Sequence, residues 1–203
     1  MTRSAVESSG RRFVVVLCHP LPDSFVRAAG DRAMRALASG GHGVEVLDLD
    51  AEGFNPLLSQ TEWALRETGV PDTLTAHVDA LRRATDLVLV YPTWYGGMPA
   101  LMKGWFDRVW GRGVAWEIRR GSGRPRGLLR NITSVWVVTS HGSNRWVNFG
   151  QGEGGLRFVR RTLRLTCAPW IRTHWVAFYG NDSAEESERL AFLARVERVF
   201  AKA

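Results

Sequence analysis

The chain has 203 residues, of which 45% are hydrophobic and 23% are charged. These proportions are typical of globular proteins and exclude a mostly disordered or collagen-like chain, and no apolar run approaches the ~20 residues that span a bilayer. Two cysteines, Cys18 and Cys167, are too few for a disulfide framework or a four-thiolate zinc site, which favours a reduced, cytoplasmic setting. We interpret residues 1–12 as a polar, flexible tail and residues 13–203 as a single domain.

The charge balance is basic. Lysine and arginine together number 27 against 20 acidic residues, which gives a formal net charge of +7, and only Lys103 and Lys202 are lysines. Arginine suits bidentate contacts with phosphates and carboxylates. No zinc-finger spacing, basic zipper or RNA-recognition signature is present. We therefore expect no nucleic-acid partner, and either a solvated basic surface or an anionic small molecule such as a nucleotide accounts for the charge.

Strand-like and helix-like segments alternate along the chain. Short apolar runs are typical of strands buried on both faces, and they predict strands over Arg12–Cys18, Val44–Leu49, Asp86–Pro92, Ile132–Ser140 and Ile171–Gly180. Helical spacing predicts helices over Phe25–Ala38, around Trp63, and over Pro71–Ala84, Pro99–Val109, Glu153–Leu165 and Ala184–Ala201, the last capped by Asp182 and Ser183. The glycine-rich stretch Gly111–Asn131 is interpreted as an irregular excursion.

Alternation of strands and helices indicates parallel βαβ units with right-handed crossovers. The prediction is an α/β, flavodoxin-like three-layer sandwich with a five-stranded parallel sheet in the order 2-1-3-4-5. Ligands of such folds bind at the carboxyl ends of the strands, near the point where the strand order reverses. Function is therefore expected in the loops that follow Cys18, Val90 and Thr139.

The first of these loops runs from His19 to Phe25 and leads into a helix. The free N–H groups and the dipole of a helix start attract anions. Ser24 adds a hydroxyl, His19 an imidazole donor, and Arg27 lies near the first turn, so this loop is a candidate phosphate site. The alternative is that Ser24 or Asp23 simply caps the helix.

The second loop, Tyr91–Pro99, presents aromatic residues followed by two glycines. Small-molecule sites are mostly apolar with a few fixed backbone donors. A planar heterocycle can stack beside Trp94, and Gly96 and Gly97 allow close backbone approach. Alternatively, Trp94 and Tyr95 are core or subunit-interface aromatics.

The third loop, Thr139–Gly155, places Ser140, His141 and Gly142 beside the second, where they can donate hydrogen bonds to the same heterocycle. An ordinary turn is the alternative. A G-x-G-x-x-G sequence also occurs in this loop. A dinucleotide-binding motif of this type directly follows a strand and is followed by an acidic residue, and this sequence meets neither requirement. We therefore interpret it as a flexible loop before a helix. No Walker loop, nucleophile elbow or metal-spaced histidine pair is present. A bound cofactor is therefore expected to carry the chemistry, and no metal is expected.

Three stretches, VVVLCHPLPDSF, FNPLLSQTEW and LVLVYPTWYGGMPALMKGWFDRVW, resemble the flavodoxin-like NAD(P)H:quinone oxidoreductase family. These flavoenzymes are related to the ancillary oxidoreductases of potassium efflux. The resemblance implies bound FMN, with FAD as the alternative, and NADH or NADPH as co-substrate. It also implies a two-electron, ping-pong transfer to a quinone or a similar electrophilic acceptor.

The resemblance further implies roles for individual residues. His19, Ser24 and Phe25 would contact the phosphate or ribityl part, Pro92, Thr93, Trp94 and Tyr95 would line the isoalloxazine, and Ser140, His141 and Gly142 would meet its pyrimidine edge. His141 is also a candidate catalytic residue. Family members are usually homodimers with active sites built from both subunits, and Trp116 is the candidate for stacking on substrate across the interface.

Departures from the family pattern leave alternatives open. Ser140, His141 and Gly142 replace a Thr-Gly-Gly run, and no histidine matches the family's proposed charge relay. An alternative function is a flavin-binding ancillary subunit that docks on a membrane transporter and has little turnover. A one-electron carrier is a further alternative, although such flavodoxins are usually acidic. No stable membrane insertion is expected.

Overall fold

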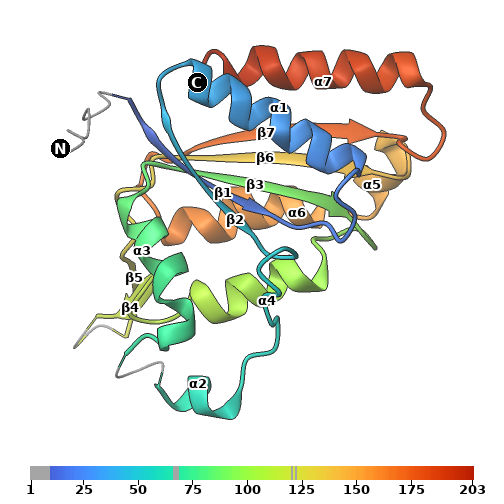
Figure 1. Ribbon diagram of the computed structural model, residues 1–203. Helices are drawn as coiled ribbons and strands as arrows, with labels where there is room; N and C mark the ends of the chain where they lie inside the picture. The colour runs from blue at the N-terminus through green and yellow to red at the C-terminus, as the bar shows by residue number, and fades with distance from the viewer. Residues whose placement is uncertain (1–9, 66–68, 120, 122) are drawn as a thin grey trace.

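The computed structural model describes residues 10–65, 69–119, 121 and 123–203. Its centre is a parallel sheet in the order β2-β1-β3-β6-β7 (Figure 1). The strands are β1 (Arg12–Leu17), β2 (Gly43–Asp48), β3 (Asp86–Thr93), β6 (Ser134–His141) and β7 (Arg172–Tyr179). The predicted tail was residues 1–12, whereas β1 begins at Arg12; residues 1–9 lie outside the described part of the chain.

The strand numbering differs from the predicted order because of an additional hairpin. The segment predicted as irregular contains β4 (Trp116–Ile118) and β5 (Pro125–Gly127), which pair antiparallel with each other and lie outside the main sheet. With this hairpin set apart, the sheet strands taken in chain order are arranged 2-1-3-4-5. The reversal point lies between β1 and β3, where a ligand is expected to bind.

Helices cover both faces of the sheet (Figure 1). One face carries α1 (Phe25–Ser39) and α7 (Glu186–Phe200), which pack against each other. The other face carries α3 (Thr75–Arg83), α4 (Ala100–Val109) and the segment that starts with α6 (Gly154–Arg157). The short helix α2 (Gln60–Leu65) lies below this second layer in the view of Figure 1.

Strand β3 shows why these runs become central strands. Seven of its eight residues are buried. Because successive side chains of a strand point to opposite faces, Leu87 and Leu89 join the core on one side, and Val88 and Val90 join the core on the other. A continuous apolar run therefore contributes side chains to two separate cores, one on each face of the sheet.

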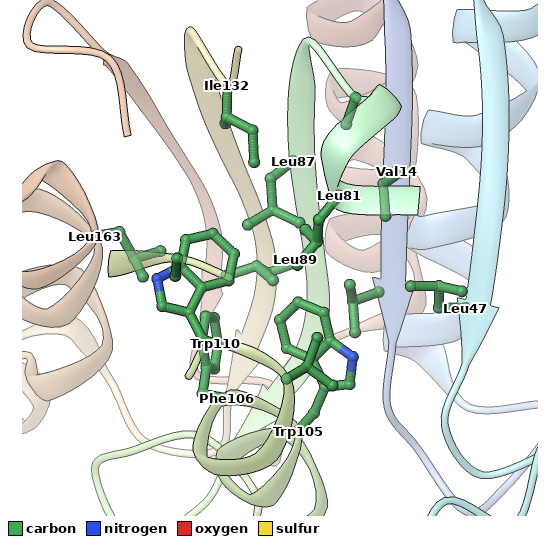
Figure 2. Close-up of a cluster of buried hydrophobic side chains, with 14 of the residues drawn as sticks. Val14, Leu47, Leu81, Leu87, Leu89, Trp105, Phe106, Trp110, Ile132 and Leu163 are labelled. Atoms are coloured by element: carbon green, nitrogen blue, oxygen red, sulfur yellow. The ribbon is translucent and has the colours of Figure 1, made fainter. Parts of the chain in front are cut away.

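Aromatic side chains of α4 and of its C-cap residue, Trp110, fill the core on the side of α3 and α4. Figure 2 shows Trp105, Phe106 and Trp110 pointing toward the leucines of β3. The ring centroids of Trp105 and Phe106 lie 5.0 Å apart with a nearly perpendicular arrangement, which is a favoured geometry for aromatic pairs. The buried indole of Trp105 donates to His77 Nδ1 at 3.3 Å, so its polar atom is satisfied.

Several helical predictions needed correction. The predicted helix Glu153–Leu165 is instead the short α6, a π-helical turn over Phe158–Thr162 and a 3-10 turn over Leu163–Leu165. The loop before it contains an unpredicted helix, α5 (Arg145–Gly150). Helix α7 is capped by Glu185, whose capping box with Glu188 replaces the predicted Asp182–Ser183 cap. Among the described helices, none combines the length and hydropathy that a bilayer crossing requires.

Candidate functional site

A cleft of about 660 Å³ opens at the carboxyl ends of β1, β3 and β6. Loops that follow these three strands converge on it, as the parallel sheet requires. All ten residues predicted to bind a cofactor line this cleft: His19, Ser24, Phe25, Pro92, Thr93, Trp94, Tyr95, Ser140, His141 and Gly142. The structure thus brings together residues that are up to 123 positions apart in the chain.

The first loop is held by hydrogen bonds to its own backbone. The amide of Leu21 donates to His19 Nδ1 at 3.1 Å, so the neutral imidazole carries its proton on Nε2. Ser24 is the N-cap of α1 and its hydroxyl accepts from the amide of Arg27 at 3.4 Å. The capping function proposed as the alternative is therefore real, and it coexists with a position in the cleft wall.

Arg27 does not point into the candidate phosphate site that the sequence suggested for it. Its guanidinium pairs with Asp48 at the end of β2 and donates to the carbonyl of His19 at 3.3 Å. Burial acts to raise the pKa of Asp48, but the hydrogen bond and charge of Arg27, with the amide of Ala51, outweigh it and hold that pKa below its usual range. Arg27 therefore fixes the loop rather than facing a ligand.

The second loop makes a tight turn at the mouth of the cleft. The amide of Trp94 donates to the carbonyl of Gly97 at 2.9 Å, and the amide of Gly97 donates back at 3.0 Å. The two central residues, Tyr95 and Gly96, have φ of +49° and +75°. A non-glycine residue in this region is uncommon and costs energy, and such strain is concentrated at functional sites.

The aromatic residues of this turn are not core residues. Trp94 is 46% exposed and Tyr95 is fully exposed. The Trp94 ring lies 6.1 Å, centroid to centroid, from the ring of His19 in the first loop. The structure therefore excludes the core alternative, and both rings are free to contact a ligand or a partner surface.

The third loop buries His141 at the floor of the cleft. Its Nδ1 lies 2.6 Å from Asn148 Oδ1, and its Nε2 lies 3.4 Å from Thr93 Oγ1. The ring stacks on Tyr179 of β7, with centroids 4.4 Å apart and planes inclined by 18°. Burial lowers the pKa of His141, against opposing effects of Asn148 and Glu153, so the neutral form is favoured at pH 7.

Eight further residues line the cleft beyond the ten predicted, and Asn148, Asn181 and Asp182 are among them. Asn148 lies on the unpredicted α5, and Asn181 and Asp182 follow β7. Asn181 donates its backbone amide to the carbonyl of His141 at 2.9 Å, while its Oδ1 is buried without a hydrogen-bond partner. A Cβ at Gly142 would lie 2.4 Å from a carboxylate oxygen of Asp182. The polar Asn-Asp pair directly after a strand was the available sequence signal for this fourth loop.

The sequence profile of a family with a flavodoxin-like fold matches residues 11–199 of the chain. The chain belongs to this flavodoxin-like family. An uncharacterized NAD(P)H oxidoreductase of Haemophilus influenzae is 33% identical over 141 residues, which are 68% of this chain and 68% of that protein. NAD(P)H dehydrogenase (quinone) 1 of Rattus norvegicus is 28% identical over 167 residues, 73% of this chain and 60% of the rat protein.

The solved structures agree with the fold. An FMN-dependent NADH-azoreductase from Bacillus anthracis, in complex with FMN, superposes with a TM-score of 0.73. It is 14% identical, and the match covers 95% of this chain and 98% of that one. At that identity the likeness extends to the flavodoxin-like fold alone.

Trp116 lies outside the cleft. It lines a second pocket of about 370 Å³, whose other walls include Trp63, Phe106 and Trp110. The nearly buried ion pair of Arg108 and Glu62 also borders this pocket. Within one flavodoxin-like subunit, Trp116 and His141 therefore belong to different pockets, and the prediction that Trp116 acts across a subunit interface stays a prediction.

Proposed function

We propose that this chain is a flavin-dependent NAD(P)H oxidoreductase that carries FMN in the cleft and reduces a quinone or a similar electrophilic acceptor by two electrons. Bound FMN supplies the chemistry, because its ring system accepts electrons from NAD(P)H and releases them to the second substrate. One observation carries the proposal. In a chain related to NAD(P)H oxidoreductases, all ten predicted cofactor residues line a single cleft at the switch point of the sheet.

The residues of the cleft fit such a cofactor. Its volume of about 660 Å³ is within the usual range of roughly 300–1,000 Å³ for ligand pockets. The wall includes a buried acceptor, Asn181 Oδ1, with no protein partner. Buried polar atoms are rarely left unpaired in native proteins, so a ligand donor would satisfy this atom.

The first loop supports binding of the anionic end. Ser24 and the N-terminal turn of α1 lie in the cleft wall, and the dipole of this fifteen-residue helix favours negative charge there. His19 keeps its Nε2 proton available as a donor, because Nδ1 accepts from the amide of Leu21. These groups would hold the phosphate, and the pair of Arg27 with Asp48 would keep the loop in place.

The second and third loops would hold the ring. Pro92 and Thr93 end β3 beside Ser140 and His141, which end β6, and the two strands are in register at these positions. Trp94 and Tyr95 stand at the open side of the cleft, where planar substrates would stack against them. Alignment of the reactants in such a slot lowers the barrier by removing the entropy cost of their encounter.

For the whole protein we propose a homodimer in a reducing, cytoplasmic compartment. Trp116 is half-buried in the second pocket and does not line the cleft of its own subunit. If it stacks on a substrate bound beside the flavin, that flavin cleft must belong to the partner subunit. Cys18 and Cys167 are both free and buried, as is usual for structural thiols in a reducing environment. NADH and NADPH are both retained as electron donors, and FAD as the alternative cofactor.

Reconstitution tests this function. Purified protein is incubated with FMN, freed of unbound FMN and assayed for menadione-dependent oxidation of NADH and NADPH. We expect retained flavin absorbance and steady-state turnover with at least one nicotinamide. Retained flavin without turnover would favour the ancillary-subunit alternative, and absence of both would refute the proposal.

A further inference from the structure

Asn148 is the closest polar neighbour of His141 in the cleft. It is buried, and it lies on α5, seven residues after the histidine. The distance of 2.6 Å between His141 Nδ1 and Asn148 Oδ1 describes a short hydrogen bond. One of these atoms must donate, and the surroundings of Asn148 decide which.

The amide group of Asn148 has only one orientation that satisfies its neighbours. Its Nδ2 faces the carbonyl oxygens of Ser143 and Asn144 at 3.1 and 2.8 Å, and it also lies 3.1 Å from Ser143 Oγ. A flipped amide would place its oxygen against two carbonyl oxygens, which cannot donate. Asn148 Oδ1 therefore faces His141 as an acceptor, and His141 Nδ1 carries the proton.

This assignment determines what the other ring nitrogen can do. In a neutral imidazole with the proton on Nδ1, Nε2 is an acceptor. Its neighbour Thr93 Oγ1 is 3.4 Å away and has a closer partner in Thr139 Oγ1 at 2.9 Å. Nε2 is thus weakly engaged by the protein, at the side of the ring that faces the cleft wall formed by Thr93.

We propose that Asn148 is a positioning residue that locks His141 in the Nδ1–H tautomer, so that Nε2 accepts a hydrogen bond from a ring N–H of the bound heterocycle. The proposal rests on the proposed function, since the imide N–H at the pyrimidine edge of a flavin is the donor in question. It reverses the sequence-based expectation that His141 donates. Acceptors such as a ring carbonyl would be excluded from this position.

The titratable groups around the ring are few. Tyr179 of β7 stacks on it, and Glu153, between α5 and α6, accepts from the Tyr179 hydroxyl at 3.3 Å. Asp182 lies beside the neighbouring Gly142. None of these groups contacts Nδ1 in the structure, so the protonation site of the neutral ring depends on Asn148.

The first test is a long-range proton–nitrogen NMR spectrum of the histidine rings in the flavin-free protein, which distinguishes the two neutral tautomers. We expect His141 in the Nδ1–H form. In Asn148→Leu the preference should shift toward Nε2–H, whereas Phe149→Leu, an exposed neighbour on α5, should leave it unchanged. An Nε2–H tautomer in the unsubstituted protein would overturn the proposal without any variant.

A second variant tests the contact itself. Asn148→Asp places a carboxylate at Nδ1, and a neighbouring negative charge favours the imidazolium. His141 should then titrate at a higher pH than in the unsubstituted protein. An unchanged titration in a folded variant would show that residue 148 does not contact the ring, which would overturn the proposal.

FMN affinity, measured by quenching of flavin fluorescence, completes the test. Loss of one net hydrogen bond weakens binding by roughly 2- to 10-fold, and we expect this loss in Asn148→Leu but not in Phe149→Leu. If the unsubstituted protein binds FMN and the two variants have equal affinities, the role of Asn148 is wrong and the proposed function stands. If the unsubstituted protein does not bind FMN, the proposed function itself fails.

Discussion

Gly104 on α4 offers a quantitative test of the packing between α4 and the loop that contains Pro56. A Cβ at this position would lie 2.4 Å from both the Cβ and the carbonyl oxygen of Pro56, and 2.5 Å from its Cα. Two of these three atoms are backbone atoms and the third belongs to a proline ring, so none can rotate away. Gly104→Ala must therefore move the loop that contains Pro56 away from α4.

The expected cost follows from two opposing effects. Overpacking of a filled site costs about 1–3 kcal/mol, and alanine recovers up to about 1 kcal/mol through its helix propensity. The net free energy of unfolding should fall by about 1–2 kcal/mol, which lowers Tm by roughly 2–8 °C at this chain length. The displaced loop also carries the carbonyl of Asn55, which accepts a hydrogen bond from Arg108.

The assay is thermal unfolding followed by circular dichroism, with Gly150→Ala as the matched control. Gly150 also lies in a helix, but a Cβ there meets nothing within 4 Å, so its Tm should stay the same or rise. Because neither Gly104 nor Pro56 lines the cleft, FMN affinity at 20 °C should be unchanged in Gly104→Ala. A Tm for Gly104→Ala equal to or above that of the unsubstituted protein would refute the packing argument.

Three further predictions concern the cleft and its surroundings. Ser24→Ala removes the cap of α1. It should lower the free energy of unfolding by about 1 kcal/mol, measured by urea unfolding, and weaken FMN binding, measured by fluorescence titration. Ser24→Thr should retain most of the stability and most of the affinity. Urea unfolding across pH should reveal stability from Asp48 and His141. The lowered pKa of Asp48 gives stability that is present above its unfolded pKa and is lost in more acidic solution, and Asp48→Asn should flatten this loss. The lowered pKa of His141 means that stability falls once pH drops below about 6.5, and His141→Gln should remove that component. Finally, Trp116→Ala should lower turnover and weaken dimerisation in sedimentation experiments. Trp170 is exposed, and Trp170→Ala should change neither property. Equal behaviour of the two variants would contradict a role for Trp116 across the interface.

The sheet was predictable because its strands are short apolar runs. Leu87–Val90 is buried on both faces, and its continuous apolar run has no helical spacing that would predict a helix instead. The hairpin of β4 and β5 was missed because its strands have only three residues each, and because β5 consists of proline, arginine and glycine, with no apolar run. The alternation of Trp116, Glu117 and Ile118 is too short to predict a strand alone, and the pairing of Trp116 with Gly127 arises only in the folded chain.

The cleft was predicted in its first three loops, since strand ends in a parallel sheet must meet at one edge. Its polar network was not predictable to the same extent. Asn148 lies on a helix of six residues followed by glycines, which carries little periodic signal. Asp182 and Ser183 looked like a helix cap, yet Ser183 donates its amide to the carbonyl of Gly180 at 3.1 Å and closes a turn at the cleft instead. Such partners are close in sequence, but they depend on loop conformations that residue patterns do not specify.

The most direct measurement is a crystal structure of the protein reconstituted with FMN. We expect the ring system between Pro92–Tyr95 and Ser140–Gly142, with the phosphate at Ser24 and the start of α1. FMN in the pocket that contains Trp116 and Trp63, or a cleft closed by Trp94 and Tyr95 in the presence of saturating FMN, would contradict it.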